Sequence, residues 1–252
     1  RQGEDIAVPV ALDQSVPLIG ADNAWNTGYT GDRWAIAVLD SGVDKNHPFL
    51  SDKVILEACY SNTDNRIGST SLCPDGSNEQ IGAGAGANCD INLPGCHHGT
   101  HVAGIAAGKG ESFSGVARDA NIISIQVFSK ESWELRCSPD PAPCIRSSTS
   151  DQIKALELIL TLHSYNIPIA AVNMSLGGGK YTSYCDSIPS ASALKAAIDN
   201  LRAVGIATII ASGNDGYTDA LRFPACISSA VSVGCLLYTS PSPRDRTRSR
   251  MP

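Results

Sequence analysis

Apolar side chains follow two alternating patterns along this chain, short continuous runs and longer stretches in which they recur every three or four positions. The continuous runs predict buried strands, each followed by small or polar residues, at 34–44, 121–128, 170–179 and 207–216. The stretches with helical spacing predict helices at 96–108, 153–165 and 192–205. In the last two helices, single apolar faces are formed by Ile153, Leu156 and Leu160, and by Leu194, Ile198 and Leu201.

The order of these elements predicts the fold class. Strands that alternate with helices indicate an α/β fold of three layers, a mostly parallel twisted sheet with helices on both faces. Thr149 and Gln152 form a capping-box pattern before one helix, and Gly205 ends the next. Residues 60–95, rich in Asn, Ser, Gly and Asp, predict a long loop held by cysteines.

A histidine stands at the start of the predicted helix at 96–108, in the run CHHGTHVAGIAAG. The small residues after it let the helix pack tightly against a sheet and hold the imidazole of His98 in a fixed place. An imidazole with an ordinary pKa of about 6.5 can take and return a proton near neutral pH. A lone histidine is more often structural, so a role for His98 in proton transfer depends on its partners.

Two predicted strands supply such partners at their carboxyl ends. Asp40 ends the strand within 34–44, and Asn214 follows the strand within 207–216. Ligands of open α/β sheets bind in the crevice outside the carboxyl ends of the strands. We therefore expect Asp40, His98 and Asn214 to converge at this edge.

The motifs LDSGVD, HGTHVAG and SGNDG, in that order, resemble those of the subtilisin-like serine proteases over about residues 5–235. The resemblance implies a secreted serine endopeptidase that hydrolyses peptide bonds with an Asp/His/Ser triad. Asp40 is expected to orient His98, His98 to activate a serine, and Asn214 to lend its amide to the oxyanion hole. The alternative from another class is a non-catalytic peptide-binding relative that has lost its nucleophile.

The run SLGGG, which ends the predicted strand segment at 170–179, favours substrate binding when it is considered with these motifs. In the resembled family this segment pairs with the substrate backbone and walls the pocket for the residue before the cut bond. Glycines suit an edge that a peptide must approach closely. The expected substrate-binding residues are Ser175, Leu176, Gly177, Gly178, Ala211, Ser212 and Gly213.

The end of the chain departs from the family. After Gly234 the sequence does not return to the family pattern, and the GTSMAxP motif that carries the nucleophile does not occur. Ser240, beside a proline and without a following helix pattern, is not accepted as that nucleophile. We expect residues 1–235 to be a partial peptidase domain, incomplete at its C-terminus, and 236–252 to be a foreign or misread tail. The polypeptide as written is therefore expected to be inactive.

Nine cysteines predict an oxidising compartment, and hence a secreted protein. Cys137 and Cys144 enclose a proline-rich loop that suits a local disulfide. Cys185 and Cys226 are expected to bond to each other, because a bridge between them would join two pieces of the proposed cleft. The connectivity of the other cysteines stays open, with Cys235 as the leftover thiol.

Composition and spacing weigh against several partners. A net charge of -6 argues against nucleic acid, and no apolar run approaches the roughly 20 residues that span a membrane. His97 and His101 have the spacing of a zinc pair but lack the glutamate of the zinc protease pattern, so no metal site is predicted. Phe49 stands where the family commonly has a calcium-binding aspartate. This departure weakens the case for the family's calcium site, so calcium binding stays open and no calcium site is identified. We expect no required cofactor, protein or peptide substrates, and a monomer.

Overall fold

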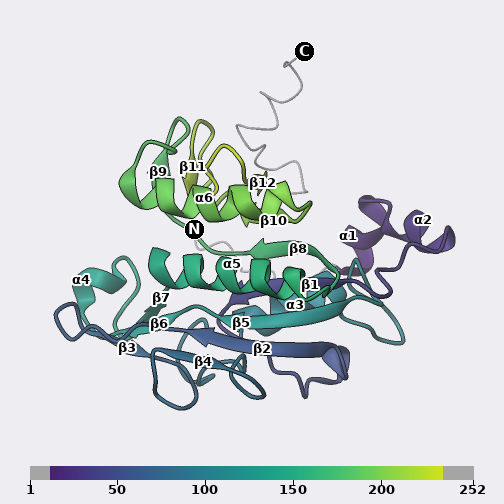
Figure 1. The fold of residues 1–252 in the computed structure, drawn as a ribbon, viewed down its shortest axis with the longest axis horizontal. Coiled ribbons are helices and arrows are strands. Elements are labelled where there is room, and N and C mark those ends of the chain that lie inside the picture. The colour runs from purple at the N-terminus through teal and green to yellow at the C-terminus, as the bar shows by residue number, and fades with distance from the viewer. Residues whose placement is uncertain (1–11, 235–252) are drawn as a thin grey trace, which may run out of the picture.

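A seven-stranded sheet forms the centre of the structure, a computed structural model that describes residues 12–234 (Figure 1). Its strands are β1 (Ala35–Asp40), β2 (Val54–Tyr60), β4 (Glu79–Ile81), β5 (Asn121–Gln126), β8 (Ile169–Met174), β10 (Ala207–Ala211) and β12 (Val231–Val233). They lie in the order β12-β10-β8-β1-β5-β2-β4, and all neighbours are parallel except β2 and β4. Their carboxyl ends therefore meet at one edge, apart from that of β4.

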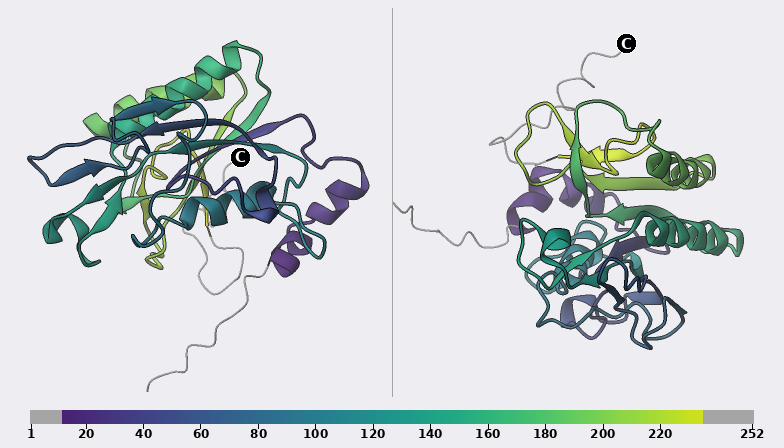
Figure 2. Two further views of the ribbon diagram at one scale, coloured as in Figure 1. Left: turned by 90° about the horizontal axis from the view of Figure 1, so that it is seen from below. Right: turned by 90° about the vertical axis from the view of Figure 1, so that its left-hand side faces the viewer.

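Helices cover both faces of this sheet (Figure 2). Within residues 12–234, the helices are α1 (Leu12–Leu18), α2 (Ala21–Asn26), α3 (His98–Ala107), α4 (Glu134–Cys137), α5 (Thr149–Ser164) and α6 (Pro189–Ala203), and Pro48–Leu50 form a 3-10 turn. Helices α5 and α6 lie on one face and α3 lies on the other. The predicted α/β fold, a mostly parallel sheet between two layers of helices, is confirmed.

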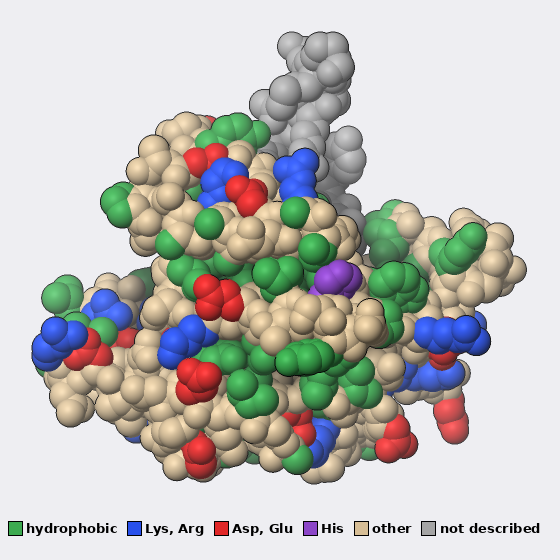
Figure 3. All heavy atoms as spheres, viewed as in Figure 1, with side chains coloured by type: hydrophobic (Ala, Val, Ile, Leu, Met, Phe, Trp, Pro, Cys, Tyr) green, Lys and Arg blue, Asp and Glu red, His purple; other side chains and the backbone are tan. Residues whose placement is uncertain are grey.

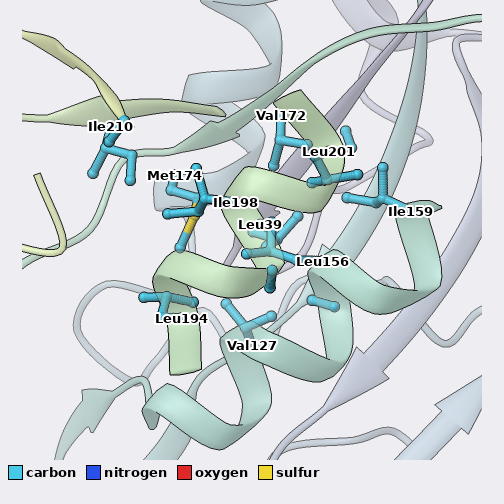
Figure 4. Close-up of a cluster of buried hydrophobic side chains, with 14 of the residues drawn as sticks. Leu39, Val127, Leu156, Ile159, Val172, Met174, Leu194, Ile198, Leu201 and Ile210 are labelled. Carbon is cyan, nitrogen blue, oxygen red and sulfur yellow. The ribbon is translucent and has the colours of Figure 1, made fainter. Parts of the chain in front are cut away.

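The hydrophobic core is divided by the sheet into two unequal parts. The larger part fills the space between the sheet and helices α5 and α6 (Figure 4), with Leu39, Leu156, Met174, Leu194, Ile198 and Leu201 all buried. The smaller part lies under α3, where Val38 and Ile122 meet Ala103 and Ala107. Strand β1 is thus apolar on both faces, as expected for a central parallel strand covered on each side.

Two small sheets and four disulfides shape the segments outside the central sheet. The first small sheet pairs β9 (Gly178–Tyr181) with β11 (Leu221–Phe223), and the second contains β3 (Ser69–Ser71), β6 (Ser129–Glu131) and β7 (Cys144–Arg146). The disulfides are Cys59–Cys73, Cys89–Cys96, Cys137–Cys144 and Cys185–Cys226. The two predicted pairings are confirmed, whereas Cys235 and the predicted tail at 236–252 lie outside the described residues.

Two local predictions need correction. Residues 60–95 are mostly loop, but they also form the three-residue strands β3 and β4. The cap of α5 is Ser148, and the capping box expected at Thr149 and Gln152 is wrong by one position. The Ser148 hydroxyl accepts a hydrogen bond from the Asp151 amide at 3.4 Å and donates one to the Asp151 carboxylate at 2.7 Å. Ser148 has the extended backbone that a cap requires, whereas Thr149 is already helical.

Acidic and basic side chains are interspersed on the described part of the face that carries α5 and α6 (Figure 3). Nucleic-acid-binding proteins typically gather lysine and arginine on one face or stripe. The mixed charges of this face do not have that distribution.

Candidate active site

Strand β1 delivers Asp40 to the carboxyl edge of the sheet, where its side chain is 1% exposed. The backbone amide of Ser41 donates a hydrogen bond of 2.7 Å to Asp40 Oδ1. The strand forms because its apolar residues are buried on both faces, and that burial fixes the position of the carboxylate at its end. Asp40 is therefore held in place by the core itself.

Helix α3 begins at His98 and turns its imidazole toward this carboxylate. The ring Nδ1 lies 2.8 Å from Asp40 Oδ1 and 3.0 Å from Oδ2. A carboxylate accepts and does not donate, so the proton of this bond belongs to Nδ1, which leaves Nε2 with a free lone pair. The His98 side chain is 47% exposed, and a substrate can therefore approach it.

The same contact changes the acidity of the imidazole. The hydrogen bond from His98 to Asp40 raises the pKa of His98 above its usual value, and the negative charge of the carboxylate acts in the same direction. Partial burial of the ring opposes this shift but is the smaller effect than the hydrogen bond. Asp40 thus both orients the ring and stabilises its protonated form.

Close backbone packing brings α3 to this position. The Gly99 amide donates a hydrogen bond of 3.0 Å to Ser41 Oγ. A Cβ atom at Gly99 would lie only 2.3 Å from the Gly42 carbonyl oxygen, so a larger residue would push the helix away from β1. No role for Ser41 was predicted from the sequence, although its position directly after Asp40 within LDSGVD was a usable signal.

The structure places the remaining candidates at the same edge without joining them to the Asp40–His98 pair. Ser175 follows β8 and Asn214 follows β10, so one strand separates the β10 end from the β1 end. Asn214 is exposed, and its side-chain amide has no hydrogen-bond partner among residues 12–234. An amide in this state is free to donate to a ligand at the edge.

The expected substrate-binding residues occupy two neighbouring loops. Ser175 Oγ accepts a hydrogen bond of 3.0 Å from the Asn173 amide, and the side chain of Leu176 packs into the main core. Gly178 begins β9 and pairs with Phe223 of β11. Three of the expected residues, Ala211, Ser212 and Gly213, follow one another at the end of β10. Their roles in binding stay predictions.

Two charged residues in these loops were missed by the sequence analysis. The guanidinium of Arg222 forms a two-point ion pair with the Asp215 carboxylate, through Nε to Oδ2 and through Nη2 to Oδ1 at 2.5 Å. This pair lowers the pKa of Asp215 below its usual range. Arg222 stands in the run LRFPAC, which carries no motif, so only the folded chain reveals the contact.

The histidines and acidic residues do not form a metal centre in the part of the chain that the structure describes. Over residues 12–234, no group of three or more His, Cys, Asp or Glu side chains is arranged to hold an ion. Phe49, the residue that was compared above with a calcium-binding aspartate, packs against Phe113 with 5.2 Å between the ring centroids.

None of the helices within residues 12–234 has the length and apolar character needed to cross a membrane.

Two curated proteases are similar in sequence to this chain. The sequence is 36% identical over 122 residues to the minor extracellular protease Vpr of Bacillus subtilis (strain 168), covering 48% of this chain and 13% of that protein. It is 29% identical over 237 residues to subtilisin E of the same organism, covering 88% of this chain and 47% of that protein. The chain therefore spans about half, or less, of the length of these curated relatives.

The solved structure of sphericase superposes on this fold with a TM-score of 0.56 at 22% identity, over 81% of this chain and 53% of the other. This likeness concerns the fold alone. The sequence profile described as the subtilase family matches residues 31–250, which is most of the chain and includes nearly all of the predicted tail. The chain belongs to the subtilase family of serine proteases.

Proposed function

We propose that the natural protein is a secreted serine endopeptidase in which Asp40, His98 and Asn214 supply the catalytic groups of this chain. The observation that carries the proposal is the hydrogen bond from His98 Nδ1 to Asp40 at the carboxyl edge of the sheet. That bond leaves Nε2 free to accept a proton, and the ring faces solvent. This is the arrangement that a general base for a hydroxyl nucleophile requires.

The proposed reaction begins with proton transfer to His98. His98 Nε2 takes the proton of a serine hydroxyl as the serine oxygen bonds to the carbonyl carbon of the peptide. The resulting imidazolium is stabilised by Asp40, and the unpartnered amide of Asn214 donates to the oxyanion that forms. His98 then gives the proton to the amine as the C–N bond breaks, which leaves the acyl group on the serine oxygen. Water, deprotonated by His98, attacks the acyl carbon, and the bond to the serine oxygen breaks as His98 returns the proton to it and the acid is released. Each step uses protein groups alone, so we propose no required cofactor.

The nucleophilic serine is proposed to lie in sequence that follows Gly234 in the natural protein. Supporting this, the chain lacks the GTSMAxP pattern, and subtilisin E is about twice the length that this chain covers. Ser240, the candidate that we reject, lies outside the described residues.

Secretion is proposed from the cysteines. Among the described residues, eight cysteines form four disulfides, which persist in oxidising environments such as the extracellular space. The relative with the name minor extracellular protease is consistent with that location. Protein or peptide substrates, and a monomeric state, complete the proposal.

The test compares this chain with an extended domain, meaning residues through Gly234 continued by the sequence that follows in the natural gene. We expect the extended domain to hydrolyse a peptide substrate and to lose that activity with a serine-directed inhibitor. The chain as written should show no turnover above background. Inhibitor-sensitive turnover by the chain as written would contradict the rejection of Ser240. Peptide binding without turnover by the extended domain would favour the non-catalytic relative.

A further inference from the structure

Arg222 lies between the two glycines that are expected to wall the substrate pocket. A Cβ atom built on Gly213 would meet Arg222 Cγ at 2.8 Å and Cδ at 2.9 Å. A Cβ atom built on Gly177 would meet Arg222 Cβ at 3.1 Å. The side-chain faces of both glycines are therefore covered by the aliphatic stem of one arginine.

Backbone and side-chain contacts hold this arginine in place. The Arg222 amide donates to the Ser212 carbonyl at 3.0 Å, and the Arg222 carbonyl accepts from the Cys226 amide at 3.1 Å. At the other end, Nε and Nη2 bind Asp215, and Nη1 donates to the Gly177 carbonyl at 3.2 Å. The side chain is fixed at its base and at its tip, so it cannot easily swing away from the two glycines.

We propose that Arg222 is a specificity-determining residue that shortens the pocket for the residue before the cut bond, so that the enzyme selects small, uncharged side chains there. The inference rests on the proposed function for the use of this edge by a peptide. A large side chain placed between Gly177 and Gly213 would have to occupy the space that the arginine stem fills. Alanine or serine would not need that space.

The ion pair also decides the charge that the pocket presents. Three N–H groups of the guanidinium are already used by Asp215 and Gly177, and the Asp215 carboxylate balances its positive charge. A substrate carboxylate would have to compete with this pre-formed pair. The pocket therefore offers little attraction to an acidic side chain while Asp215 is present.

The test uses three N-acetylated tetrapeptides that are identical except for the last residue, which is alanine, phenylalanine or glutamate. Calorimetry measures the binding of each peptide to this chain. We expect the alanine peptide to bind most tightly. Arg222→Ala should improve binding of the phenylalanine peptide at least tenfold relative to the alanine peptide. Arg202→Ala, which removes an exposed arginine from α6, is the matched control and should leave the ratio unchanged.

A second variant covers the case in which Arg222→Ala fails to fold. Asp215→Asn keeps the arginine but removes its counter-charge, and it should improve binding of the glutamate peptide relative to the alanine peptide. Tighter binding of phenylalanine than alanine by the unchanged protein, or ratios that neither variant alters, overturns the inference. Absence of binding by every peptide overturns it as well.

Turnover of the same peptides as chromogenic amides by the extended domain separates this inference from the proposed function. Selective binding without cleavage contradicts the proposed protease activity and leaves the assignment of Arg222 supported. Cleavage with a preference for phenylalanine contradicts the assignment of Arg222 and leaves the protease activity supported.

Discussion

The two sides of the carboxyl edge are built in different ways. On one side, β1 and α3 meet through the backbone, with Gly99 against the Gly42 carbonyl and Asp40 fully buried. On the other side, the loops after β8 and β10 are joined by side chains, through the Arg222–Asp215 ion pair and the Cys185–Cys226 disulfide. The Arg222 and Asp215 side chains remain 34% and 25% exposed.

This difference separates two tasks. Under the proposed function, proton transfer demands a fixed distance between His98 and Asp40, and the close backbone packing at Gly99 supplies it. Selection among substrates demands only that a pocket have a given size and charge, which exchangeable side chains can set. Substitutions on the first side should therefore abolish the reaction, whereas those on the second should redirect it.

The largest effect is expected from His98→Ala in the extended domain. Loss of the general base should reduce kcat/KM roughly 10⁶-fold, because triad members act as a unit. His97→Ala and His101→Ala are the matched controls, since both side chains are exposed and neither contacts Asp40. Turnover assays and circular dichroism distinguish lost chemistry from lost folding. Equal losses at His97 would show that the wrong histidine has been chosen.

Asp40→Asn should reduce kcat roughly 10⁴-fold, because an amide cannot hold the imidazole in the same tautomer or stabilise its cation. It should also lower the pKa of His98, which the carboxylate raises. In the proposed mechanism the base form of His98 is the active one, so the acid limb of the pH–rate profile of the extended domain should lie above pH 6.5 and move down in the variant.

An NMR titration of the His98 ring measures the same shift on this chain without turnover. Because the pKa of His98 is higher in the folded chain than in the unfolded chain, the Asp40–His98 contact stabilises the fold. This stabilisation is complete at pH values below the unfolded pKa of about 6.5, and it is lost as the pH rises through the folded pKa. An unchanged His98 pKa in Asp40→Asn would contradict the assigned cause.

The sequence predicted the first side of the edge well and the second side only in part. Asp40 and Asn214 each follow an apolar run and His98 begins one, all within recognisable motifs, so their placement is determined by local pattern. Arg222 lies in no such pattern, and its contact with the Gly177 carbonyl spans 45 positions of sequence. Asp215 lies within SGNDG, but the motif does not indicate its ion pair with Arg222. The one-residue error at Ser148 has a different cause, because neighbouring Ser and Thr residues offer the same capping chemistry and only backbone geometry chooses between them.

Removal of the Cys185–Cys226 disulfide by a double serine substitution should cost about 4 kcal/mol of unfolding free energy, from the chain-entropy model. This bridge closes a separation of 41 residues, whereas Cys137–Cys144 closes only 7. The same double substitution at Cys137 and Cys144 is the matched control, with an expected cost of about 2.5 kcal/mol. Urea unfolding measures both, and peptide mapping without reduction should recover Cys185 and Cys226 in one linked fragment.

Loss of the Cys185–Cys226 disulfide should also destabilise the loops after β8 and β10 more than it destabilises α3. The Asp40–His98 contact does not depend on the loops that this disulfide joins, so the pKa of His98 should be retained in the variant. A larger cost at Cys137–Cys144, or either of Cys185 and Cys226 alkylated as a free thiol, would contradict the prediction.

Gly99→Ala tests the backbone side of the comparison with the smallest possible change. One methyl group at this position would stand 2.3 Å from the Gly42 carbonyl oxygen and 3.1 Å from Asp40 Cβ, so α3 must move away from β1. We expect a cost of about 2 kcal/mol, because overpacking outweighs the gain in helix propensity. Gly178→Ala is the matched control, since nothing lies within 4 Å of a Cβ atom there, and it should change the free energy of unfolding by less than about 0.5 kcal/mol. Urea unfolding measures both variants, and the His98 titration shows whether the helix shift reaches the Asp40–His98 pair. The pKa of His98 should fall in Gly99→Ala alone, because a longer bond to Asp40 stabilises the imidazolium less. Equal stability of the two variants, with the His98 pKa unchanged, would show that side chains rather than backbone packing hold the pair together.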